Sequence, residues 1–144
     1  MRPAFGDYII LMRKPGDNPQ PIDTDVTRDE WIQWARPIWY NIRETDTLNV
    51  AEARSADDER HIAPLQLQTI ERCVRLWSNK NDLVLSPFAG IGSEGVESVK
   101  HGRRFVGIEL KPEYYDVAIK NLFRAQQDRD SGTLFDLLND EASI

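Results

Sequence analysis

Three glycines and one glutamate have a spacing that suggests chemistry. Gly90, Gly92 and Gly95 lie in the stretch SPFAGIGSEG with the spacing GxGxxG, and Glu109 ends the next apolar run. A glycine loop between a strand and a helix presents backbone N–H groups to a ligand and lets it approach closely. An acidic residue that ends the following strand can accept hydrogen bonds from two ribose hydroxyls. The pattern predicts a site for an adenosine-containing ligand.

The glycine spacing alone leaves other uses open. It can form a packing turn that binds nothing, and a small dinucleotide site is a second alternative, although a full dinucleotide fold needs another strand–helix–strand half. A Walker-type phosphate loop is excluded, because no Lys-Ser/Thr pair follows the glycines.

The elements around the loop alternate between helix and strand. Residue patterns predict a helix that begins near Pro64, a strand over 82–86, a helix over 93–100, a strand over 104–110 and a helix that begins at Pro112. This alternation predicts that the two strands are adjacent and parallel, joined by the helix between them. The apolar faces expected for the first and last of these helices are Leu67, Ile70, Val74 and Trp77, and Tyr115, Ala118, Ile119 and Leu122.

The N-terminal part carries weaker signals. Residues 7–13, DYIILMR, have the composition of a strand. Thr27 and Glu30 form a capping-box pattern that predicts a short helix, which Pro37 ends. Residues 38–63 are interpreted as a solvated loop or, alternatively, as a surface that meets substrate. The residues that favour the second interpretation are Trp39, Tyr40, Arg43, Arg54 and Arg60.

Composition limits the class of protein. The 144 residues carry a net charge of −6, most of it in residues 128–144, which argues against a free-standing nucleic-acid-binding domain. No apolar run is long enough to span a membrane, and the single cysteine, Cys73, allows no internal disulfide and fits a cytoplasmic location. No metal site is expected. Arg103 and Arg104 are interpreted as surface charges, with phosphate contacts as the alternative.

The run from 82 to 122 resembles the S-adenosylmethionine-binding region of DNA amino-methyltransferases, which carry a DPFxGxGT-like motif followed by a GRRFIGIE-type strand. The preceding HIAPLQLQTIER is similar to that family's HPTQKPLxLIER segment, and FGDYIILMRKPG is similar to its strand followed by RKPG. The resemblance covers about residues 5–125. It implies a partial Rossmann-like α/β methyltransferase fold, with a mostly parallel sheet flanked by helices.

The resemblance also implies a cofactor, S-adenosylmethionine, and its site. Glu109 would hold the ribose, and the segment from His61 to Gln66 would close over the methionine end. The other residues assigned to the cofactor site are Ser86, Pro87, Phe88, Ala89, Gly90, Gly92 and Ser93. The chain departs from the family pattern where Ser86 replaces an aspartate and Glu94 replaces a threonine, and HIAPLQ lacks a lysine.

The family's catalytic loop is Asp/Asn/Ser-Pro-Pro-aromatic, and no Pro-Pro occurs in this sequence. In the motif order seen here that loop would precede Met1, so no catalytic residue is assigned. We expect three parts: a strand and an irregular, candidate DNA-facing segment over 1–60, a cofactor-binding α/β core over 61–127, and an acidic tail over 128–144.

The resulting hypothesis is the cofactor-binding portion of a site-specific DNA methyltransferase of a restriction–modification type, which methylates an exocyclic amine of adenine or cytosine. We expect the chain alone to be inactive, and to meet DNA only through the complete enzyme, with an upstream catalytic segment or partner chain. The alternative is a non-catalytic interaction module that retains the fold.

Overall fold

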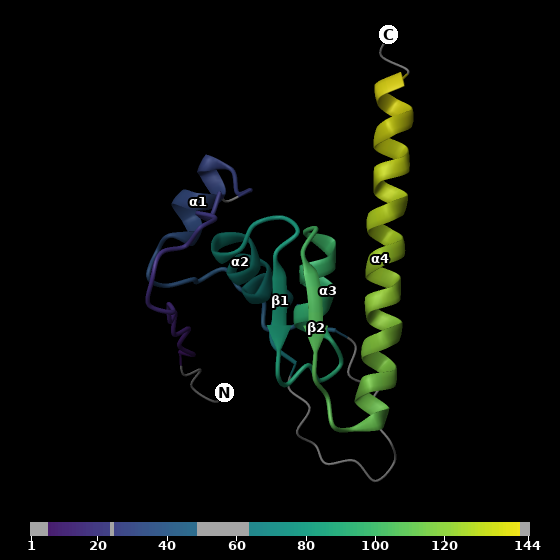
Figure 1. Ribbon diagram of the computed structural model, residues 1–144, viewed down its shortest axis with the longest axis horizontal. Coiled ribbons are helices and arrows are strands. Elements are labelled where there is room, and N and C mark those ends of the chain that lie inside the picture. The colour runs from purple at the N-terminus through teal and green to yellow at the C-terminus, as the bar shows by residue number, and fades with distance from the viewer. Residues whose placement is uncertain (1–5, 24, 49–63, 142–144) are drawn as a thin grey trace.

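The computed structural model describes residues 6–23, 25–48 and 64–141, with the backbone alone for 132–141. Two strands and three helices form an α/β unit, and an N-terminal arm, residues 6–48, lies beside it (Figure 1). The elements in chain order are α1 (Arg28–Trp34), α2 (Leu67–Trp77), β1 (Leu83–Ser86), α3 (Ser93–Lys100), β2 (Arg104–Gly107) and α4 (Pro112–Glu141).

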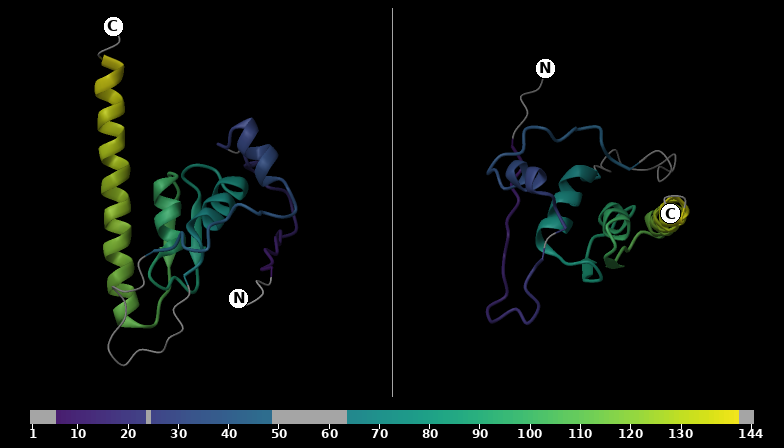
Figure 2. Two further views of the ribbon diagram at one scale, coloured as in Figure 1. Left: turned by 180° about the vertical axis from the view of Figure 1, so that it is seen from behind. Right: turned by 90° about the horizontal axis from the view of Figure 1, so that it is seen from above.

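The two strands form a parallel sheet, as predicted. Leu83 of β1 pairs with Arg104 of β2, and Ser86 pairs with Gly107 at the other end. Helix α3 makes the crossover between them. Seen from above, helices α2, α3 and α4 all lie on the same side of the strands (Figure 2).

Small apolar residues fill the space between the helices. Val96 of α3 and Val117, Ala118 and Ala125 of α4 are buried, together with Ile91 from the loop before α3. Burial of such side chains is the main favourable contribution to folding.

The arm begins its helix as the sequence predicts. The Thr27 hydroxyl accepts a hydrogen bond from the Glu30 N–H, and the Glu30 carboxylate accepts one from the Thr27 N–H, so the capping box is confirmed. After α1 the chain turns back, and the Trp39 indole donates to the Trp34 carbonyl at 2.8 Å. The guanidinium of Arg72, from α2, lies 5.6 Å from the Trp34 ring centre and 5.0 Å from that of Trp39. Cation–π contacts therefore help to hold the arm against α2.

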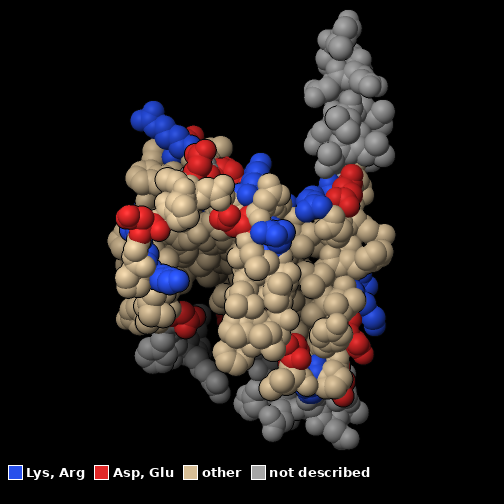
Figure 3. Space-filling view, in the orientation of Figure 1, with Lys and Arg blue, Asp and Glu red and all other residues tan. Residues whose placement is uncertain are grey.

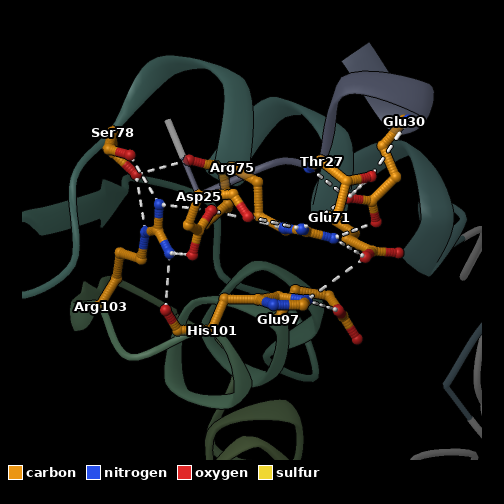
Figure 4. Close-up of polar contacts among 10 residues, drawn as sticks. Asp25, Thr27, Glu30, Glu71, Arg75, Ser78, Glu97, His101 and Arg103 are labelled. Carbon is orange, nitrogen blue, oxygen red and sulfur yellow. Dashed lines mark hydrogen bonds and ion pairs between the residues drawn. The ribbon is translucent and has the colours of Figure 1, made fainter. Parts of the chain in front are cut away.

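Charged side chains also join the arm to the α/β unit (Figure 4). Arg75 of α2 lies 2.9 Å from Glu30 and 3.4 Å from Asp25. It also lies 2.9 Å from Glu71 of its own helix. Arg103, whose side chain is fully buried, contacts Asp25 at 2.8 Å. Burial raises the pKa of Asp25, but hydrogen bonds and charges from Arg103 and Arg75 outweigh burial and leave that pKa below its ordinary value.

The strand expected over residues 7–13 is not formed. These residues have no ladder partner within the described part of the chain, and the side chains of Tyr8, Ile10 and Met12 are exposed. Strand composition provides propensity only, whereas a strand also needs a neighbour for its backbone hydrogen bonds.

Three helix predictions need correction. Helix α2 begins at Leu67, after a Gln66 N-cap, rather than near Pro64. Helix α4 continues to Glu141, through the segment expected as a tail, because a single glycine at 132 costs only about 1 kcal/mol and no proline follows. On α4, Tyr115 and Ile119 are exposed rather than packed.

The prediction that Arg103 is a surface charge is wrong. Its guanidinium donates to the carbonyls of Ser78 and His101, both at 2.6 Å, and it pairs with Asp25. A buried arginine is tolerated when its donors are satisfied in this way. Arg104, by contrast, is exposed as expected.

Within the described ranges, no helix combines the length and the apolar character needed to cross a bilayer.

Candidate functional site

The glycine loop, residues 86–93, connects the carboxyl end of β1 to α3. Gly90 and Gly92 have φ values of 53° and 89°, in the left-handed region that favours glycine. A Cβ on Gly92 would lie 3.2 Å from Cβ of Ala118, so α4 passes directly against the loop. A Cβ on Gly95 would lie 2.6 Å from side-chain atoms of Leu122 and Phe105. The GxGxxG spacing therefore has a structural reason at each glycine. Gly90 and Gly92 have left-handed backbone conformations, and Gly92 and Gly95 lie too close to α4 for a side chain.

Residues of the loop alternate between the core and the surface. Ala89 and Ile91 are buried, and the Ala89 N–H donates to the Ile108 carbonyl at 2.9 Å, which ties the loop to the end of β2. Phe88 points the other way and is 86% exposed. The loop thus has a fixed inner side and an outer side that presents an aromatic ring.

Glu109 lies at the loop, as the sequence analysis predicts. One carboxylate oxygen accepts from the Gly90 N–H and the other from the Lys111 N–H, both at 2.8 Å. An ionised carboxylate has about four lone-pair positions, so each oxygen keeps capacity for another donor. The carboxylate fixes the loop against the start of α4 and can still bind hydroxyl groups.

Two serine residues of the loop are buried. Ser86 is 7% exposed and Ser93 is 5% exposed. Neither Oγ makes a hydrogen bond to any residue that the structure describes. Because a buried hydroxyl normally has a hydrogen-bond partner, these two groups indicate a polar ligand or bound water at the loop.

The structure brings together most of the predicted site. Gln66 is half-buried at the N-terminus of α2, and its carbonyl accepts from Thr69 and Ile70 of its own helix, so no described contact joins it to the loop. His61 lies outside the described residues. The predicted residues that form the loop site are Ser86, Pro87, Phe88, Ala89, Gly90, Gly92, Ser93 and Glu109.

Three residues that contact the loop or its apolar cluster were not predicted from the sequence. The Asn121 side chain, on α4, donates to the Ile91 carbonyl at 2.9 Å. Leu48 of the arm and Tyr114 of α4 pack against the Ile91–Val117 cluster. A lone asparagine on a helix face that is otherwise apolar is the only local signal for the first of these.

An acidic side chain lies beside the loop. Glu94 is half-buried in the first turn of α3, and burial raises the pKa of its carboxyl above the ordinary value.

The outer side of the loop is open. Two hollows, of about 390 and 280 Å³, lie near the C-terminal end of α3, and neither is lined by a residue of the loop. Ligand sites normally enclose most of the ligand's surface. Within the described residues, the loop alone therefore does not enclose a ligand.

Several known proteins are similar to this chain in sequence. The model of a DNA methylase family, N6_N4_Mtase, matches residues 7–120. The type II methyltransferase M.BglI of Bacillus subtilis is 32% identical over 118 residues, which are 81% of this chain and 30% of that protein. The DNA adenine methyltransferase YhdJ of Escherichia coli (strain K12) is 34% identical over 64 residues, 44% of this chain and 22% of that protein.

A solved structure shows the same fold. A protein from Thermus thermophilus, solved as a DNA modification methylase in complex with S-adenosyl-L-methionine, matches with a TM-score of 0.61 and 28% identity. The match covers 79% of this chain and 41% of the Thermus chain. This chain therefore spans less than half the length of each of these relatives.

Proposed function

Because the chain belongs to the DNA methylase family, whose model matches residues 7–120, we propose that it is the S-adenosylmethionine-binding portion of a site-specific DNA methyltransferase. The observation that carries the proposal is the loop site, in which Glu109 reaches the Gly90 N–H and two buried serine hydroxyls have no described partner. The relatives named as type II methyltransferases favour a restriction–modification role.

The residues of the loop fit this cofactor. Glu109 would accept hydrogen bonds from the ribose hydroxyls through its remaining lone pairs. Ser86 and Ser93 would satisfy their hydroxyls on its polar groups, and Phe88 offers an exposed aromatic face. His61 and Gln66 remain proposed to close the methionine end. When bound, S-adenosylmethionine supplies a methyl group on a sulfonium.

The acceptor in this proposal is an exocyclic amine of adenine or cytosine. Its lone pair is delocalised into the base, so the reaction depends on groups that position and polarise the amine. No Pro-Pro loop occurs in the 144 residues. We propose that an upstream catalytic segment or a partner chain supplies those groups and the contact to DNA, and that this chain alone does not methylate DNA.

A non-catalytic interaction module remains the second candidate. The observation that favours it is Ser86, which stands where the resembled family has an aspartate and so provides no charge for a cofactor's amino group.

Calorimetry with S-adenosylmethionine separates these two functions. Glu109→Ala should weaken binding by about 10- to 150-fold, since hydrogen bonds to a charged acceptor contribute roughly 1.5–3 kcal/mol. Glu113→Ala, an exposed acid in the first turn of α4, is the matched control and should bind as wild type does. Because Glu109 also holds two backbone N–H groups, thermal unfolding of both variants checks the fold.

The absence of binding by the wild-type chain would favour the interaction module. Methyl transfer is then measured with tritiated S-adenosylmethionine and mixed-sequence DNA, with and without a co-expressed segment that carries a Pro-Pro loop. Transfer should require the added segment, and robust transfer by residues 1–144 alone would contradict the proposal.

A further inference from the structure

The carboxylate of Glu94, in the first turn of α3, is half-buried and lacks a basic partner in the described part of the chain. It interacts with its own backbone N–H and forms no ion pair with a residue that the structure describes. Burial raises the pKa of this carboxyl, because no nearby positive charge stabilises its ionised form. Buried charges are normally paired. A cationic ligand at this position would therefore supply a partner that Glu94 lacks.

Two other acids between α2 and α3 are already paired (Figure 4). Glu97, one turn further along α3, contacts Lys100 at 2.9 Å and His101 at 3.4 Å. Burial raises the pKa of Glu97, but the hydrogen bonds and charges of these two residues outweigh burial and leave that pKa below its ordinary value. Glu71 of α2 pairs with an arginine of its own helix at 2.9 Å. Glu94 differs from both in having no such partner among the described residues.

Helices α2 and α3 lie side by side and run in the same direction. Glu71 of α2 lies 3.7 Å from His101 at the end of α3. Further along, the carbonyl of Ser78, just after α2, accepts from the Arg103 guanidinium at 2.6 Å. Residue numbers rise together along this contact, so the two helices begin at the same end of the unit, which is the end of the glycine loop.

Glu94 lies at this end. It precedes Glu97 by three positions and so shares a face of α3 with it, one turn nearer the glycine loop. Gln66 is the N-cap of α2 and is one of the residues proposed to close the methionine end of the cofactor. Glu94 therefore lies on the side of α3 that faces α2, near the proposed methionine end.

The proposed cofactor brings positive charge to that end. S-adenosylmethionine carries a sulfonium, an ammonium and a carboxylate, so its net charge is positive. Among the loop residues assigned to the cofactor, Glu109 alone is charged, and it is proposed to hold the ribose. The surface over β1 and β2 is mainly uncharged, with acidic and basic side chains mostly around its margin (Figure 3). Glu94 is the acid beside the loop that can supply the missing counter-charge.

We propose that Glu94 is a specificity-determining residue of the cofactor site, whose carboxylate binds the ammonium group of S-adenosylmethionine. This inference rests on the proposed function. A hydrogen bond between two charged groups is shorter and stronger than one between neutral groups, and partial burial strengthens it further. Glu94 therefore favours ligands that carry the amino-acid part of the cofactor over ligands that carry the nucleoside alone.

Calorimetry with three ligands tests this role. The ligands are S-adenosylmethionine, S-adenosylhomocysteine, which keeps the ammonium but has no sulfonium, and methylthioadenosine, which has no amino-acid part. Glu94→Gln should weaken the binding of the first two by at least about 10-fold, because a hydrogen bond between charged groups is lost, and should leave the third unchanged. Glu113→Gln, at an exposed acid in the first turn of α4, is the matched control and should bind all three as wild type does.

Urea denaturation without ligand separates a binding role from a structural one. Since Glu94 has no basic partner in the described part of the chain, Glu94→Gln should not lower the free energy of unfolding. A less stable variant that binds all three ligands more weakly would make Glu94 a structural residue and overturn the inference. Weaker binding of S-adenosylmethionine alone would assign Glu94 to the sulfonium, and would overturn it as well.

The failure of the proposed function looks different. If the wild-type chain binds none of the three ligands, the proposed function fails and this inference fails with it. If wild type binds S-adenosylmethionine and Glu94→Gln binds it equally well, the proposed function stands and the inference alone fails. Glu109→Ala, by contrast, should weaken all three ligands, because each of them carries the ribose.

Discussion

The α/β unit is stabilised by one kind of interaction, and the N-terminal arm is attached to it by another. The unit packs apolar residues between α3 and α4, with Ile91 and Val117 in the same cluster. The arm is fixed mainly by charge, through the Asp25 pair with Arg103 and the cation–π contacts of Arg72. Apolar burial changes little with pH, whereas ion pairs depend on protonation. The two regions should therefore respond differently to the same perturbations.

The largest expected effect comes from Arg103, a residue of the unit that pairs with Asp25 of the arm. Arg103→Met removes the partner of Asp25 and leaves the carbonyls of Ser78 and His101 without their donor. The Arg103 side chain is fully buried but that of Asp25 is 22% exposed, so most of the loss, about 3 kcal/mol in all, comes from the carbonyls that lose their donor. We expect the free energy of unfolding, measured by urea denaturation, to fall by that amount.

Arg104→Met is the matched control. Arg104 is the next residue, is exposed, and its Nε donates to the Asn81 carbonyl. Its substitution should change the free energy of unfolding by no more than about 0.5 kcal/mol. Equal losses for the two variants would show that the Arg103–Asp25 pair does not couple the arm to the unit.

The two regions also differ in how well the sequence predicts them. In the unit, the parallel strand pair and α3 follow from local patterns, and Gly90 and Glu109 come together because both follow strands of one sheet. The ends of the helices are predicted less accurately than their existence, since α4 extends past its expected end. Helix ends depend on small free-energy differences that one glycine does not decide.

In the arm, the capping box was predicted because both of its residues are local. The strand over 7–13 was not formed, because its partner cannot be read from the segment itself. The burial of Arg103 depends on Asp25, which lies far away in the sequence. The burial of Ser86 and Ser93 likewise depends on how the loop packs in three dimensions, which the residue types alone do not predict.

A smaller effect should be confined to the unit. Gly95→Ala places a Cβ 2.6 Å from atoms of Leu122 and Phe105. Overpacking of a core typically costs about 1–3 kcal/mol, from which the better helix propensity of alanine recovers up to about 1 kcal/mol. We expect a net loss in the free energy of unfolding. The hydrogen-exchange protection of α1 should fall only as far as this loss of global stability requires, because α1 belongs to the arm.

A double-mutant cycle with Leu122→Ala gives the control for this clash. Shortening Leu122 removes one of the two colliding groups, so the double variant should be more stable than the sum of the single effects predicts. Strict additivity would mean that the contact between α3 and α4 adapts without strain, and that the third glycine of the loop motif is not required for packing.

The smallest effect is a pH-dependent release of the arm. Hydrogen bonds from Arg75 and Thr27 lower the pKa of Glu30, and the two arginines lower that of Asp25 although burial opposes them. A carboxyl with a lowered pKa in the folded state adds stability above its unfolded value. That stability is lost as the pH falls through the lower folded value, so release should begin below roughly pH 4. Each pair is partly exposed and should contribute no more than about 1 kcal/mol.

Hydrogen-exchange protection should therefore fall earlier for α1 than for α3 during acid titration. The double variant Asp25→Asn, Glu30→Gln removes both titrating groups, so its α1 protection should be lower at pH 7 and nearly independent of pH. A variant that keeps the wild-type pH profile would show that the arm is held by its tryptophan contacts rather than by its ion pairs.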